Sequence, residues 1–238
     1  MANKLTPENI EAAAQHLENI QSGATPILDK QQGVNEPPEV ENYTKISAAG
    51  DVDKQLVYPL IPPNDPRLLM QVAPFLDENL EQFGFKDRID LSKVMYDNMA
   101  KYGGLGLSAN QVGLPYRMFV MGGHPEIEDG KVRSVFNPLI NDVSPESINL
   151  KEGCLSFPFL FLSIKRPKWC SVSYTDENGE EVNETLHGMS ARIFMHENEH
   201  MNGYIFTDLV SKLKLERAEK SKQKMIKEIK RRQSGLKF

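Results

Sequence analysis

The segment His196-Glu197-Asn198-Glu199-His200 holds the residues best suited to chemistry. Side chains four residues apart lie on one face of a helix, so both imidazoles can bind one cation. Glu197 then stands beside the cation as a candidate general base. In a chain with five histidines, this spacing arises by chance roughly 0.01 times. The pattern therefore favours a metal site over two unrelated surface histidines.

A catalytic metal commonly takes three protein ligands and leaves a fourth position for water. The third ligand could come from His124, His187, an acid or a thiolate. Cys154 lies in the turn-like segment EGCLS that follows an apolar run. A lone cysteine is more often a small buried apolar residue, and Cys170, within a strand-like run, keeps that interpretation.

The segment GLGLSANQ, from Gly104 to Gln111, is a third candidate. Its small residues let the backbone approach another chain closely, and the Gln111 amide can donate a hydrogen bond to an oxyanion. Alone this is weak evidence, because glycine-rich segments are usually turns and the spacing is not that of a phosphate-binding loop.

Short helices and strands must position these groups. The sequence predicts a helix over Asp90–Lys101 and another that carries the two histidines and ends near Gly203. Apolar runs bounded by Gly, Pro, Asn and Asp predict strands at Tyr116–Met121, Val132–Phe136, Ser147–Leu150, Trp169–Thr175 and Glu181–Leu186. The tripeptide ENG at 177–179 predicts a hairpin. Antiparallel strands followed by a helix indicate an α+β fold.

The composition is that of a globular protein. The 238 residues are 39% hydrophobic and 26% charged, and no apolar run approaches the ~20 residues of a membrane span. The segment MANKLTPENIEAAAQ has neither a basic leader nor an apolar core, so we expect no secretory signal and a cytoplasmic location. Two cysteines are too few for a disulfide framework.

Charge divides the chain. Residues Ser211–Phe238 carry 11 Lys/Arg and 3 Glu, a net charge of +8 within a total of −5. The segment also has a partial apolar stripe, formed by Leu215, Ala218, Met225, Ile226 and Ile229. We predict a basic amphipathic helix, and docking by one face alone and binding to RNA or another polyanion are equally good interpretations.

The chain divides into three predicted regions. Residues 1–55 form an N-terminal extension, with a short helix capped by Thr6 and a proline-containing connector over Ala24–Lys54. Residues 56–210 form the catalytic domain, and residues 211–238 form the basic helix. We find no function for the N-terminal extension.

Taken in order, GLGLSANQ, EGCLS and HENEH resemble the three motifs of the peptide deformylase family. The resemblance extends over about Tyr58–Leu209. It implies the deformylase α+β fold, with antiparallel sheets packed around the HExxH helix. It also implies a metal-dependent hydrolase of protein biosynthesis that removes the N-formyl group from the N-terminal formylmethionine of nascent polypeptides and releases formate.

The resemblance also implies the roles of individual residues. The metal ligands would be Cys154, His196 and His200, holding Fe(II), with nickel, cobalt or zinc accepted in its place. Glu197 would take a proton from the attacking water and pass one to the departing amine. The Gln111 side chain, the Leu155 backbone N–H and the metal would stabilise the oxyanion.

For the substrate, the resemblance implies strand-like pairing of the peptide with the Gly106 backbone. Leu105, Met189 and Ile193 would line the pocket for the methionine side chain, although such residues can equally be core. In some bacterial deformylases a C-terminal helix docks on the ribosome, and the charge of residues 211–238 suits the same partner.

Arg166 would pair with Glu152 and orient the cysteine loop. Two departures stand out: Ser108 replaces a usual Ala, and Glu199 replaces a usual Asp beside the second histidine, which bears on metal affinity or ligand orientation. The segment FPFLFLS, residues 157–163, is also more apolar than usual, as a substrate rim or a partner contact would be.

Two other functions fit parts of the sequence. One is a metallo-amidase or peptidase acting on other N-acyl peptides, because HExxH alone suits that class. The other is an inactive homologue that binds ribosomes or RNA through its basic helix. The cysteine motif argues against the first, and the complete set of ligands and base argues against the second.

Overall fold

The computed structural model describes residues 41–46 and 52–235. The strands are β1 (Glu41–Ile46), β2 (Val52–Val57), β3 (Gly106–Ser108), β4 (Met118–Gly122), β5 (Val132–Val143), β6 (Ser147–Cys154), β7 (Phe157–Pro167), β8 (Trp169–Thr175) and β9 (Glu181–His187). The α-helices are α2 (Arg88–Lys101), α3 (Gly188–Met201) and α4 (Lys212–Gly235). Short 3-10 turns join several of these elements.

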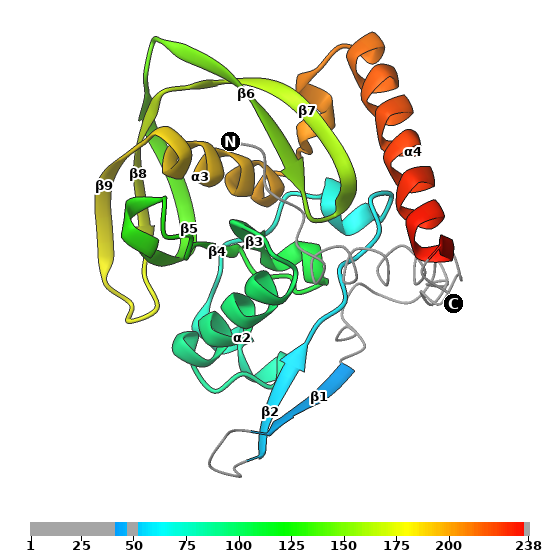
Figure 1. The fold of residues 1–238 in the computed structure, drawn as a ribbon. Coiled ribbons are helices and arrows are strands. Elements are labelled where there is room, and N and C mark those ends of the chain that lie inside the picture. Colours follow the sequence, from blue (N-terminus) through cyan, green and yellow to red (C-terminus); the bar gives the residue numbers. More distant parts are fainter. Residues whose placement is uncertain (1–40, 47–51, 236–238) are drawn as a thin grey trace.

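The strands form antiparallel sheets around one helix. A five-stranded sheet has the order β3-β4-β5-β8-β9, while β6 pairs with β7 and β1 pairs with β2. Figure 1 shows α3 in the middle of the molecule, with β6 and β7 curving over it and α4 on the outside. The predicted α+β class with sheets around the HExxH helix is confirmed.

Packing explains why α3 is so firmly placed. Alternate residues of β8 point inward, and Cys170 and Val172 join a core cluster with Ile193, Phe194 and Met195 of α3. At the C-terminal end of α3, the Arg117 guanidinium donates 2.8 Å to the carbonyl oxygen of Met201. A cation there complements the helix dipole. The helix is therefore fixed along its length and at its end.

Most of the predicted elements are confirmed. The helix at Asp90–Lys101 begins two residues earlier, capped by Asp87, whose side chain accepts from the Asp90 N–H at 2.8 Å. The ENG turn joins β8 to β9, and both of these strands follow the predicted runs closely. Residues 212–235 form the predicted terminal helix.

Three expectations need correction. FPFLFLS, for which no strand was predicted, belongs to strand β7, and β3 lies inside the glycine-rich segment. Part of the predicted connector is not a connector, because 41–46 and 52–57 pair as the hairpin β1–β2. These two segments contain Tyr43, Thr44, Ile46, Val52 and Val57, residue types that favour strands, but the nearby prolines outweighed this signal. The predicted helix after Thr6 lies outside the described residues.

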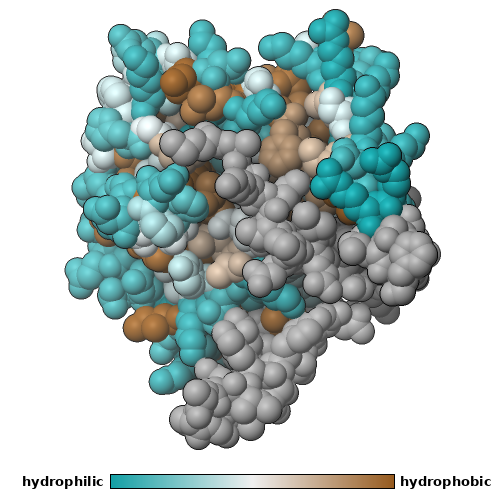
Figure 2. Space-filling model, viewed as in Figure 1, coloured by the Kyte–Doolittle hydropathy of each residue, from teal (hydrophilic) through white to brown (hydrophobic). Residues whose placement is uncertain are grey.

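The surface agrees with the composition. Within the described residues, no helix has the length and apolar character needed to cross a membrane. Figure 2 shows hydrophilic side chains over most of the coloured surface, with smaller apolar patches between them.

Candidate metal centre

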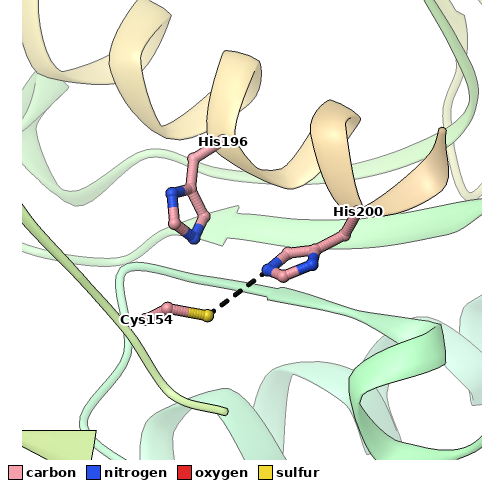
Figure 3. A group of neighbouring side chains, drawn as sticks. All are labelled: Cys154, His196 and His200. Carbon is pink, nitrogen blue, oxygen red and sulfur yellow. Dashed lines mark hydrogen bonds between the residues drawn. The ribbon is translucent and has the colours of Figure 1, made fainter. Parts of the chain in front are cut away.

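Two elements bring a sulfur and two imidazoles together. His196 and His200 lie on α3, and Cys154 is the last residue of β6. Their ligand atoms all lie within 4.8 Å of one another, and Cys154 Sγ is 3.4 Å from His200 Nε2 (Figure 3). Both imidazoles are buried, and the thiol is half-buried. Of the possible third ligands, His124 and His187 are not part of this group.

These donors fit a divalent transition metal. Thiolate and imidazole suit zinc, iron and their neighbours, and each must be deprotonated to bind. Burial lowers the pKa of His200 and keeps its ring neutral. Burial also lowers the pKa of His196, but hydrogen bonds with Cys154 and Glu152 outweigh it and raise that pKa. A cation would therefore compete with a proton at His196.

A buried carboxylate orients the first histidine. Glu152 Oε2 lies 3.3 Å from His196 Nδ1, which leaves the opposite ring nitrogen directed at the sulfur. Arg166 donates to the two Glu152 oxygens at 2.6 and 2.9 Å. Burial alone would raise the pKa of Glu152, but its hydrogen bonds with His196 and Arg166 lower it to about 2. Glu152 is therefore ionised and is a fixed acceptor for His196.

Two further residues complete this network. Glu199, the departure from the family Asp, binds Arg166 through both oxygens at 2.6 and 2.9 Å. Arg192 contacts Glu152 and donates to the carbonyl oxygens of Ile164 at 3.1 Å and Ile148 at 2.7 Å. The longer Glu199 side chain therefore keeps an ion pair with Arg166.

The candidate base lies in a closed environment. Ser108 Oγ donates to Glu197 Oε2 at 2.6 Å. A Cβ placed on Gly106 would lie 2.4 Å from Glu197 Oε1, so only glycine allows this approach of β3 to the carboxylate. Burial raises the pKa of Glu197 although the Ser108 hydrogen bond opposes it. A carboxyl group with a raised pKa accepts and returns a proton more readily at neutral pH.

The Gln111 amide is held in one orientation. The Ser108 backbone N–H donates to Gln111 Oε1 at 2.9 Å, which directs Nε2 toward the sulfur. Gln111 Nε2 lies 3.4 Å from Cys154 Sγ and 3.1 Å from Ser156 Oγ. Leu155 follows the cysteine and packs against a core cluster. The amide donor therefore faces the candidate metal site.

The candidate pocket residues separate into two kinds. Ile193 is buried in the core cluster that contains β8, and Leu105 packs against the same cluster. Met189, in the first turn of α3, is 39% exposed. Cys170 is buried in this cluster as well, and burial raises its pKa to about 11. The core interpretation of Cys170 is confirmed.

Sequence reasoning missed three supporting residues. Arg192 had no motif around it, although an arginine between apolar residues of a buried helix needs a partner. Asn110 donates to the His200 carbonyl oxygen at 3.0 Å. The ring of Phe206 lies 5.7 Å from the His196 ring, between centroids. Arg192 alone left a signal, because it faces the core by helical spacing.

Comparisons with known proteins identify relatives. A sequence model of the polypeptide deformylase family matches residues 60–216. A peptide deformylase of Thermotoga petrophila is 40% identical over 152 residues, covering 63% of this chain and 85% of that protein. One from Wolbachia pipientis of Culex pipiens is 37% identical over 176 residues, covering 70% of this chain and 94% of that protein.

Solved structures show the same similarity. The crystal structure of the Thermotoga maritima peptide deformylase has a TM-score of 0.57 and 37% identity, covering 65% of this chain and 98% of that one. The Ehrlichia chaffeensis peptide deformylase, in complex with actinonin, has a TM-score of 0.61 and 37% identity, covering 71% and 97% of the two chains. About a third of the chain lies outside these matches.

The carboxylates around Arg166 should differ in their effect on stability. The Glu152 side chain is 6% exposed and the Glu199 side chain is 22% exposed. Glu152→Gln should lower the free energy of unfolding by about 3–5 kcal/mol, because it leaves two buried guanidinium groups without their shared carboxylate. Glu199→Gln, the matched control, should cost about 1–2 kcal/mol. Urea unfolding of both apo-proteins measures this, and equal costs would contradict the network.

Proposed function

The chain belongs to the peptide deformylase family, and we propose that Cys154, His196 and His200 are its metal ligands and Glu197 its general base. As a peptide deformylase, it removes the N-formyl group from nascent peptides. The observation that carries the assignment of residues is the convergence of one sulfur and two imidazoles within 4.8 Å, beside a buried carboxylate.

We propose Fe(II) as the native metal, with nickel, cobalt and zinc as substitutes. The family is metal-dependent. The donors on this chain are one thiolate and two imidazoles, which can bind all four cations. Magnesium and calcium prefer oxygen ligands, so this donor set supports a transition metal instead. When bound, such a cation lowers the pKa of a water molecule and polarises the formyl oxygen.

Glu197 moves the protons of the reaction. Ser108 holds Oε2, while Oε1 lies beside Gly106, where the substrate backbone would pair. Glu197 takes a proton from the water that attacks the formyl carbon. It then passes that proton to the amine nitrogen as the C–N bond breaks, so the products are formate and a free N-terminus. Its raised pKa suits both steps.

Two donors of this chain stabilise the oxyanion. The Gln111 Nε2 amide is fixed by the hydrogen bond that Oε1 accepts from Ser108. The Leu155 backbone N–H is the second donor, and it follows directly after Cys154. Both groups favour charge that develops only in the transition state, because they are oriented before the reaction begins.

The peptide would bind as an added strand along β3. Within the described residues β3 pairs with β4 alone, so its other edge has no strand partner, and an extended peptide would pair there near Gly106. The methionine side chain would enter between Leu105, Ile193 and the exposed Met189. A single helix, α3, thus presents both pocket residues and ligands.

Removing the base should abolish turnover and spare the metal. Glu197→Ala should lower kcat for formate release from formyl-Met-Ala-Ser by about 10²–10⁴-fold, because it removes the proposed proton acceptor. The protein is reconstituted with nickel, and metal content is measured beside the rate. Glu181→Gln on the exposed strand β9 is the matched control. Full activity in Glu197→Ala would contradict the assignment.

The Ser108 hydroxyl should contribute to the rate without being required. Ser108→Ala removes the 2.6 Å hydrogen bond to Glu197 Oε2 and leaves that oxygen free to rotate. We expect kcat to fall about 5- to 30-fold, as for loss of one hydrogen bond to a charged group, with KM and metal content unchanged. Steady-state kinetics tests this, and an unchanged kcat would show that backbone packing alone positions Glu197.

We propose that two of the three predicted regions have separate roles. Residues 56–210 catalyse the reaction, and α4, in the third region, docks on the ribosome. The apolar side of α4 is occupied, since Leu215 and Ala218 pack against the cluster of β7 and Phe206. A basic face is exposed, formed by Arg217, Lys220, Lys224 and Lys227 at spacings of three and four. This face supports binding to ribosomal RNA.

Reversing that face should weaken ribosome binding without disturbing the core. The triple variant Lys220→Glu, Lys224→Glu and Lys227→Glu should lose salt-sensitive co-sedimentation with ribosomes between roughly 50 and 200 mM salt. The control reverses Lys86, Lys131 and Lys165, which are also exposed. Turnover of the free peptide should stay unchanged in both. Equal pelleting of the two variants and the natural chain would contradict the docking.

A further inference from the structure

An exposed aromatic ring lies beside the metal centre on the outer face of β6 and β7. Phe161 is 44% exposed, whereas its neighbours Leu160 and Leu162 are buried. Gly153 of β6 lies directly opposite Phe161 in the antiparallel register. A Cβ placed on Gly153 would lie 2.9 Å from Phe161 Cε1. The ring therefore lies over the Gly153 backbone.

The alternation of β6 fixes the position of this ring relative to the site. Glu152 points inward to Arg166, so Gly153 presents its backbone outward, and Cys154 follows with its sulfur among the imidazoles. Phe161 thus pairs with the residue that precedes the proposed ligand Cys154, and its ring lies on the solvent side of the two strands. The ring is therefore not part of the core.

The bound peptide would pass this ring. A Cβ on Gly104 would lie 2.8 Å from Leu155 Cδ1, so the segment leading into β3 meets the end of β6. Within the described residues, β3 pairs only with β4 and β6 only with β7, so one edge of each strand has no strand partner. Successive side chains of an extended peptide point to opposite sides. If methionine points inward, the next side chain points outward.

We propose that Phe161 is a specificity-determining residue, favouring substrates in which an apolar residue follows formylmethionine. The inference rests on the proposed site and deepens it. The ring offers an apolar surface on the side where the second side chain emerges. Lys151 lies on the same outer face, opposite Ser163, and is exposed, so a second residue that is basic meets both an apolar ring and a like charge.

The expected preference is modest and appears mainly in KM. Contact between a side chain and a half-exposed ring changes kcat/KM by roughly 2- to 10-fold. Since the contact is the same in the ground state and the transition state, it alters binding more than kcat. The ranking should be Leu or Phe, then Ala, then Lys at the second position.

Four peptides and two variants test this. The nickel-loaded full chain is assayed for formate release from formyl-Met-Leu-Ser, formyl-Met-Phe-Ser, formyl-Met-Ala-Ser and formyl-Met-Lys-Ser. Phe161→Ala should remove the preference for Leu and Phe over Ala. Phe161→Glu should raise kcat/KM for the Lys peptide above that for the Leu peptide, which a purely structural role for the ring would not do.

Controls separate this inference from its premise. Leu139→Ala removes an apolar side chain that is 59% exposed on β5 and should keep the natural ranking. Thermal unfolding checks each variant, and Phe161→Gln replaces either one that fails to fold. The same ranking in all variants would overturn the role of Phe161 while leaving the deformylase site intact. No formate from any peptide, with metal bound, would overturn the proposed site and this inference together.

Discussion

The ionised carboxylate of Glu152 is the constraint on which the site depends. It is buried, and it is stable there only because Arg166 and Arg192 both donate to it. Through its other oxygen it faces His196, so one carboxylate fixes the rotamer of a candidate ligand. Because Glu152 and Cys154 share strand β6, the network that holds the histidine also holds the sulfur. The strand and the helix are thus joined through charge.

The same network accommodates Glu199, the residue that stands where the family usually has Asp. A glutamate reaches one methylene farther than an aspartate, and here both of its oxygens lie within hydrogen-bond distance of Arg166. Arg166 is then shared between two carboxylates, and Arg192 balances the charge on Glu152. Glu199 therefore pairs with Arg166 and leaves the contact between Glu152 and His196 in place.

Sequence patterns predicted local elements and failed where distant segments decide the structure. Strand β8 and the ENG hairpin were found because alternation and turn chemistry are local signals. β7 was missed because FPFLFLS shows no alternation of apolar and polar residues, although in the structure Leu160 and Leu162 are buried and Phe161 between them is exposed. Three residues of β3 are too few to show any period.

The site shows the same division between local and distant information. The spacing of the histidines and the order of the motifs predicted Cys154, His196 and His200 as one group, and the fold places these three side chains together. The role of Ser108 depends on a partner 89 residues away, so no local pattern reveals it. Helical spacing places Arg192 toward the core but does not identify its partner, which is 40 residues away. Close approaches of this kind bear on the glycines as well: a Cβ on Gly106 would meet the Glu197 carboxylate, and a Cβ on Gly153 would meet the ring of Phe161. In both cases the space that a Cβ would fill is taken by a side chain of another element, Glu197 of α3 or Phe161 of β7. The role of each glycine therefore depends on a residue that is distant in the sequence.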